Sequence, residues 1–160
     1  MDMSIITKLS FLLNGYLEQL RKLDPMTKGL WGKMSVQQMI EHMTDSLREA
    51  NGKTPQTIIS PVDRLSAMKE FIMSEKEFRP NTKNSLMGET PLPLRKLSMK
   101  EAIDELEIEL KDFEKYFEKN PESIIVNPFF GELNFEEWIQ LIHKHAMHHL
   151  RQFGVSLPPS

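Results

Sequence analysis

Four of the chain's five histidines lie in one short segment, residues 134–154, and the fifth is far away in the sequence. The four are His143, His145, His148 and His149, and the fifth is His42. Imidazole is a ligand for zinc, nickel, copper and iron, so such a concentration suggests metal chemistry. His145 and His149 are four residues apart, which places both rings on one flank of a helix and lets them reach a single ion.

The segment that carries these histidines has the start and stop signals of a helix. Asn134 is a good N-cap, Glu137 stands at the capping-box position, and Gly154 is a typical residue after the last turn. Between these signals, apolar residues recur at three- and four-residue spacing and predict one buried stripe. They are Phe135, Ile139, Ile142, Ala146, Leu150 and Phe153. On this helix His145 and His149 fall at the edge of the stripe and face inward.

His42 lies on a second predicted helix, which begins at Ser35 and ends at Asn51-Gly52. A single histidine beside an apolar stripe is ordinarily a hydrogen-bonded core residue. If the second and last helices are neighbours, however, His42, His145 and His149 converge inside the fold. Three imidazoles leave coordination positions open for water or substrate, which is the arrangement of catalytic rather than structural sites.

Other polar residues are candidates for the surroundings of this site. Gln152 lies one turn beyond His149, so it either orients that ligand, contacts substrate, or is an ordinary polar residue at the helix edge. Trp138 shares the flank of His145, and we interpret it and His148 as candidates for the second layer or for substrate contact. His143 is expected at the surface or in an incidental position.

Other kinds of active site find little support. The sequence has no glycine-rich phosphate loop, no nucleophile elbow and no inward-facing Glu-x-x-His pairs of a di-iron bundle. Glu41 and Asp45 flank His42, but their positions on the helix predict that both point outward. They are therefore weak candidates for acid–base chemistry.

Composition limits the class of protein. The 160 residues are 39% hydrophobic and 27% charged, which predicts a single globular domain over residues 1–160. The net charge of −3, with both signs mixed along the chain, argues against nucleic acid or an anionic membrane as partner. Cysteine is absent, which fits a reducing compartment. The N-terminal residues make a poor signal peptide and no stretch has transmembrane length, so we expect a cytoplasmic protein.

The remaining elements predict an all-α protein. Helices are expected over residues 4–23 and 98–120, with a shorter one over 64–75, and period-two alternation is absent apart from a stray pair of strands. The fold class is therefore a four-helix bundle with an additional short helix and a long 52–97 connection. Residues 121–133 are expected to form an ordered connector, in which Phe129 and Phe130 plug the end of the bundle.

Two stretches resemble a known family. In HKHAMHHLRQFG, four residues are spaced H-x-x-H-H-x-x-Q, as in the last helix of the DinB-like (YfiT-like) superfamily. WGKMSVQQMIEHM, which contains Trp31, Ser35 and His42, resembles the second helix of that family. NPFFGELNFEEWIQLIHKH is most similar to an uncharacterised branch that is known only as a domain of unknown function.

This resemblance implies a four-helix bundle that holds a divalent metal, with zinc or nickel favoured, through three histidines. Carried over by position, the ligands are His42, His145 and His149. Similar proteins are often dimers, so a homodimer is an expected state. Some relatives are transferases or isomerases that use a low-molecular-weight thiol, and many have no known activity.

We therefore expect a metal-dependent enzyme acting on a small molecule. The leading hypothesis is a thiol-dependent transferase that acts on a small electrophile, because a bound divalent ion activates a thiol or water. The alternatives are a metal-dependent hydrolase and a non-catalytic stress protein that binds a metal or ligand. Residues 52–97 match no motif of the family and are a candidate region for substrate selectivity.

Overall fold

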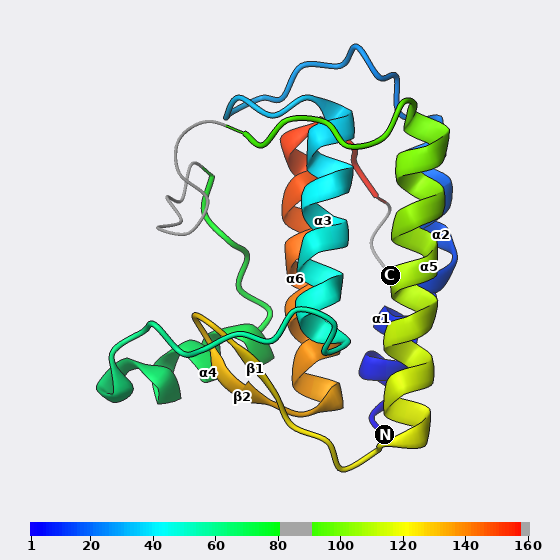
Figure 1. Ribbon diagram of the computed structural model, residues 1–160. Coiled ribbons are helices and arrows are strands. Elements are labelled where there is room, and N and C mark those ends of the chain that lie inside the picture. Colours follow the sequence, from blue (N-terminus) through cyan, green and yellow to red (C-terminus); the bar gives the residue numbers. More distant parts are fainter. Residues whose placement is uncertain (81–90, 158–160) are drawn as a thin grey trace.

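The computed structural model describes residues 1–80 and 91–157. Figure 1 shows that helices dominate this part of the chain. The helices around the core are α1 (Met3–Leu13), α2 (Gly15–Lys22), α3 (Val36–Ala50), α5 (Met99–Lys119) and α6 (Phe135–Gln152). A single turn, η1 (Val62–Arg64), leads into the short helix α4 (Leu65–Met73), and an antiparallel hairpin joins β1 (Ile125–Asn127) to β2 (Gly131–Leu133). The prediction of an all-α fold is confirmed.

These five helices surround one apolar core. α3 packs against α5 and α6, α1 packs against α2, α5 and α6, and α2 also packs against α5, so each helix contacts two others or more. In Figure 1, α3 and α6 lie side by side and run in opposite directions. Apolar faces of the helices fill the space between them, and the large side chains that are fully buried include Tyr16, Met39, Met43, Leu47, Phe113, Phe117 and Trp138.

Two capping boxes fix where α3 and α6 begin. At α3, the Ser35 hydroxyl accepts from the backbone amide of Gln38 at 3.1 Å, and the Gln38 amide oxygen accepts from the backbone of Ser35 at 2.9 Å. Asn134 and Glu137 make the same reciprocal pair at α6, with both distances 2.9 Å. Because the direction of each side chain follows from its position after the helix start, these caps indicate which way the histidines face.

The first predicted helix, residues 4–23, is in fact two helices. The break is at Asn14, whose backbone leaves the helical region (φ −132°, ψ −80°). Its side-chain amide donates to the carbonyl of Ser10 at 2.9 Å, which is the local competition that makes asparagine a poor residue inside a helix. Leu12 and Leu17, on either side of the break, are both buried in the same core.

The connector over residues 121–133 forms the hairpin, which lies with α4 beside one end of the α3–α6 pair (Figure 1). The amide of Ile59 donates to the carbonyl of Pro128 at 2.8 Å, so the hairpin is held to the 52–64 segment. Phe129 and Phe130 are only half-buried, and Leu133 and Trp138 fill the fully buried positions. Of the predicted long connection, residues 81–90 lie outside the described part of the chain.

Residues 74–78 run along α6 and are held there by charged side chains. The buried ammonium of Lys144 donates to the carbonyl of Ser74 at 2.9 Å and to that of Lys76. Arg151 adds an ion pair with Glu77 at 3.5 Å. These contacts fix the path of the chain as it approaches Phe78.

Within residues 1–80 and 91–157, none of the helices is both long enough and apolar enough to cross a bilayer.

Candidate metal centre

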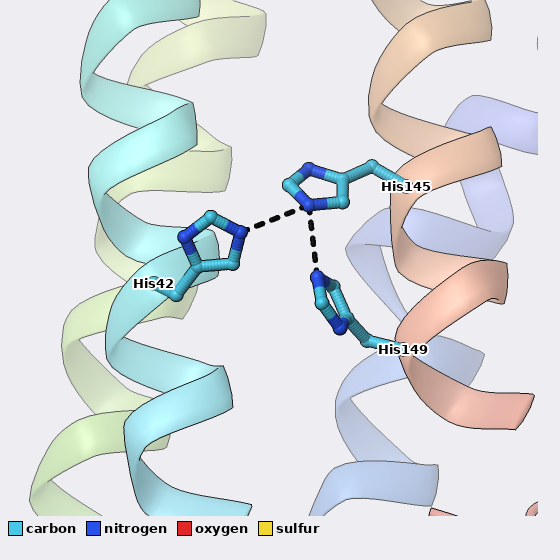
Figure 2. A group of neighbouring side chains, drawn as sticks. All are labelled: His42, His145 and His149. Atoms are coloured by element: carbon cyan, nitrogen blue, oxygen red, sulfur yellow. Dashed lines mark hydrogen bonds between the residues drawn. The ribbon is translucent and has the colours of Figure 1, made fainter. Parts of the chain in front are cut away.

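Three histidine side chains meet between α3 and α6. The Nε2 atom of His145 is 3.0 Å from Nε2 of His42 and 2.9 Å from Nε2 of His149 (Figure 2). One nitrogen from each of the three rings lies within 4.8 Å of the other two. The structure therefore brings together the three residues that the spacing and the resemblance selected, although His42 and His145 are 103 residues apart in the chain.

The hydrogen bonds of Gln152 decide the tautomer of His149. The Gln152 amide nitrogen donates to the carbonyl of Trp31 at 2.9 Å, which leaves its oxygen to face Nδ1 of His149 at 2.7 Å. That oxygen only accepts, so Nδ1 carries the proton and Nε2 of His149 presents a lone pair. Fixing a ring through its second nitrogen is the usual support of a metal-ligating histidine.

A metal ion fits this donor set. In a tetrahedral zinc site with bonds of about 2.0–2.1 Å, two nitrogens lie about 3.3–3.4 Å apart, which is a few tenths of an ångström more than the distances seen here. Nε2 of His149 carries no proton, so only the Nε2 atoms of His42 and His145 can carry one. Without an ion, at most two protons are therefore available to the three nitrogens that face one another. A divalent cation is the partner that satisfies all three, and the group can therefore hold one.

Burial keeps the three rings neutral. Removal from water, with a smaller contribution from neighbouring histidines, lowers the pKa of His42 to about 4 and that of His149 to about 3. Burial likewise lowers the pKa of His145, with contributions from His149 and His42. Because the charged form of a histidine is the protonated one, each lowered pKa means a free lone pair at neutral pH, the form that binds a metal.

The loop before α3 is fitted closely around Gln152. The amide of Leu30 donates to the main-chain carbonyl of Gln152 at 2.7 Å, in addition to the side-chain bond to Trp31. Gly32 has a φ of +76°, and a Cβ atom there would lie 2.8 Å from the Gln152 amide nitrogen. Glycine is required at this position both for its backbone conformation and for the approach of the side chain.

Aromatic side chains adjoin the histidines on the α6 side. The ring of Phe78 lies 6.3 Å from His145 and 5.9 Å from His148, measured between centroids. His148 in turn lies 5.1 Å from His149 and 5.4 Å from Trp31. His148, predicted as a second-layer or substrate residue, thus stands directly beside the cluster.

A surface depression adjoins His42 on the α3 side. Its lining includes apolar and charged residues, which are Met34, Pro91, Leu92, Glu41, Asp45 and Arg95. The prediction that Glu41 points outward is wrong. Its carboxylate is buried and accepts from the backbone amide of Arg95 at 2.7 Å and from Gln37 at 3.0 Å, so it anchors the 95–96 segment to α3.

Two residues considered with the site lie elsewhere. Trp138 is buried on the hairpin side, where its indole nitrogen donates to the carbonyl of Ile125 at 3.1 Å. His143 faces α1 and is half-buried against Phe11, with ring centroids 5.8 Å apart. Burial lowers the pKa of His143 to about 4. Because the ring is half-buried against Phe11, it is not at the surface, and its position is the incidental one among the two expectations.

Sequence reasoning missed Phe78 as a neighbour of the cluster and the Trp31 carbonyl as the partner of Gln152. Both belong to loops, where no periodicity indicates the direction of a side chain. For Trp31 the family resemblance was a signal, because it placed this tryptophan in the same motif as His42. No comparable signal marked Phe78.

Comparison with known proteins supports the same interpretation as the geometry. The model of the DinB superfamily matches residues 17–153, which is most of the chain and includes all three histidines. The chain therefore belongs to the DinB superfamily, as its two motifs predicted. Neither the curated proteins nor the solved structures contain a significant match.

Family and geometry agree on a metal-binding type of site. DinB-like proteins bind metals, and this chain has a three-histidine group that could hold a metal ion. That His42, His145 and His149 are the ligands stays a prediction.

Proposed function

We propose that this protein is a divalent-metal-dependent enzyme and that His42, His145 and His149 are its ligands. The observation that carries the proposal is the convergence of three neutral Nε2 atoms, one of which is held in its tautomer by Gln152. A structural zinc site uses four protein ligands, so a three-histidine set is typical of a site that also admits water or substrate. Zinc and nickel are the favoured ions, since both accept neutral imidazole.

The reaction we propose is transfer of a low-molecular-weight thiol to a small electrophile. A divalent ion at the three histidines supplies the Lewis acidity that makes a thiol ionise near neutral pH. The thiol must come from solution, because the chain has no cysteine. The sulfur–carbon bond forms as the leaving group departs with its electron pair, and the thiol proton is released to solvent.

The chain's own residues contribute orientation. Gln152 holds the ring of His149, and the 29–32 loop holds Gln152. The ring of Phe78 borders the cluster on the α6 side, 6.3 Å from the ring of His145 between centroids. A ligand set fixed in this way needs little rearrangement when substrate binds, which is the general advantage of a preorganised site.

Two other functions remain as alternatives. Water is a second nucleophile for the same site, so a metal-dependent hydrolase uses the same residues. The burial of His149 is the observation that favours a non-catalytic protein that stores a metal or ligand under stress. We place the protein in the cytoplasm and propose a homodimer, which light scattering in solution tests directly.

Metal analysis of the untagged protein tests the site. We expect close to one equivalent of divalent metal in the wild type and loss of that metal in His42→Ala, His145→Ala and His149→Ala. His143→Ala is the matched control, because that ring lies on the same helix but faces α1. Equal metal content in all four variants would refute the ligand assignment.

An activity screen then separates the alternatives. Metal-loaded protein is assayed with several small thiols against an electrophile, and with esters and amides in the absence of thiol. Conjugation that is lost in His42→Ala supports the transferase, whereas hydrolysis alone supports the hydrolase. A loaded protein that is inert in both assays supports the binding protein.

A further inference from the structure

We propose that the metal centre receives a ligand whose non-reacting part is uncharged and either aromatic or aliphatic. The part would pack against four side chains, Trp31, Met34, Phe78 and Leu92, which we call the apolar wall. This inference rests on the proposed function, because it names the class of molecule that the same centre binds.

Phe78 forms the part of the wall next to His145 and His148. Its ring is half-buried and contacts two other phenylalanines, Phe71 at 5.4 Å and Phe130 at 6.3 Å between centroids. One edge of the ring is thus supported by neighbours while the side chain as a whole stays partly exposed beside the histidines. A supported aromatic ring with free surface is a typical binding surface for another apolar group.

Met34 and Leu92 form the part of the wall next to His42. Both line the depression that His42 also lines, and Leu92 is 59% exposed, so its side chain has free apolar surface there. The Gln38 side chain donates to the carbonyl of Leu92 at 3.0 Å, which holds this leucine over the N-terminal part of α3. Trp31 completes the wall through its contact with His148.

The charged groups of the same depression are already engaged with one another. Arg95 binds Asp45 at 3.2 Å and Glu105 at 2.9 Å, and burial together with the nearby Glu105 raises the pKa of Asp45 against the opposing effect of Arg95. Glu41 accepts backbone amides of the 95–96 segment. A charged ligand would have to break these pairs to be neutralised, whereas an uncharged one leaves them intact.

Phe78 is held at the wall by Lys144. The lysine ammonium bonds to the carbonyls of Ser74 and Lys76, and it also lies 4.7 Å from the centre of the Phe71 ring that supports Phe78. These contacts of Lys144 are with residues 71–76 and not with the nitrogens of the three histidines. It is therefore a positioning residue for the wall.

The test compares molecules that share one metal-binding group and differ in the rest. Protein loaded with Co²⁺ is titrated with benzyl mercaptan, 2-mercaptoethanol, 2-mercaptoethanesulfonate and cysteamine, and binding is followed by the absorption bands of the ion. We expect benzyl mercaptan to bind about tenfold more tightly than the two charged thiols, the range that one aromatic contact provides. Benzohydroxamate and acetohydroxamate form a second pair that involves no thiol.

Variants of the wall identify the contact. Phe78→Ala should weaken the aromatic ligands about tenfold while leaving the metal content and the binding of 2-mercaptoethanol unchanged. Phe78→Leu keeps an apolar surface and should lose only part of the effect. Phe129→Ala, a half-buried phenylalanine of the hairpin, is the matched control and should bind every probe as the wild type does. Circular dichroism confirms that each variant is folded.

The outcomes distinguish this inference from the proposed function. Equal affinity for aromatic and charged thiols, or an equal effect of Phe78→Ala on all probes, overturns the apolar wall. If no thiol binds but benzohydroxamate exceeds acetohydroxamate in a Phe78-dependent way, the wall stands and the thiol reaction fails. A protein that takes up no metal overturns both.

Discussion

At the scale of single residues, Gln152 connects the candidate metal centre to the rest of the molecule. Its side chain joins His149 to Trp31, and its main chain receives the amide of Leu30. The residue is 3% exposed, so each of these bonds is made away from water and its loss is not repaired by solvent.

Replacing Gln152 by Leu should lower the affinity for metal by about 10- to 100-fold, the usual effect of losing the group that orients a ligating histidine. Leucine has a similar size but no acceptor for the Nδ1 proton of His149. Competition with a chelator measures the affinity. Gln152→Glu keeps an acceptor for that proton and should retain more of the affinity; if it behaves like Gln152→Leu, orientation of His149 is not the role of this residue.

Glu49, two turns beyond His42 on α3, makes the stability of the protein depend on pH. Burial, with a smaller contribution from Asp45, raises its pKa from 4.5 to about 7. The folded state therefore holds this proton more tightly than the unfolded state, and stability falls as the pH rises through the interval from the ordinary pKa to about 7.

Glu49→Gln should remove this dependence. The variant should gain about 1–2 kcal/mol over the wild type at pH 8, a value reduced for the solvent screening of a half-buried group, and the gain should shrink towards pH 4. Urea unfolding at several pH values measures the difference. A gain that is the same at every pH would show that the effect is one of packing and not of ionisation.

At the scale of helices, each of the two capping boxes both stabilises its helix and defines the residue at which the helix begins. Asn134→Ala removes the acceptor for the Glu137 amide and should cost about 1 kcal/mol in the free energy of unfolding. The fraying of the first turn of α6 is far from His145, so metal content should not change. Loss of metal together with stability would show that the start of α6 controls the orientation of the histidines more strongly than we infer.

These caps explain why so much of the site could be predicted. A helix with a known first residue and a regular stripe has a defined inward face, so His42, His145 and His149 were placed without knowledge of the fold. Their meeting still required that α3 and α6 be neighbours, and the spacing alone leaves that open. The family resemblance implied that these two helices are neighbours.

The features that the sequence did not predict have local physical causes. The break at Asn14 falls within an unbroken stripe, because the two helices on either side bury their apolar residues in one core. Glu41 was placed outward from its angle on the helix, but the 95–96 segment covers that face with backbone amides. Phe78 lies in an irregular segment, and the path of that segment is set by Lys144, which belongs to a helix far along the chain.

At the scale of the whole molecule, the candidate site joins segments from opposite halves of the chain. His42 and His145 are 103 residues apart, so an ion bound by both closes a very long loop. A metal that binds only the folded state raises the free energy of unfolding by about 2.7 kcal/mol at one hundred times its dissociation constant. Thermal unfolding with and without zinc should show this increase in the wild type and in His143→Ala but not in His145→Ala.

The two tryptophans occupy different regions of this molecule, and that difference gives the protein two independent optical signals. Trp31 borders His148 and holds Gln152 through its carbonyl, whereas Trp138 is buried against the hairpin. In Trp138→Phe, the remaining emission should change when metal enters the centre. In Trp31→Phe, the emission should stay constant during metal binding and change only when the core unfolds, so fluorescence separates events at the histidines from the loss of the fold.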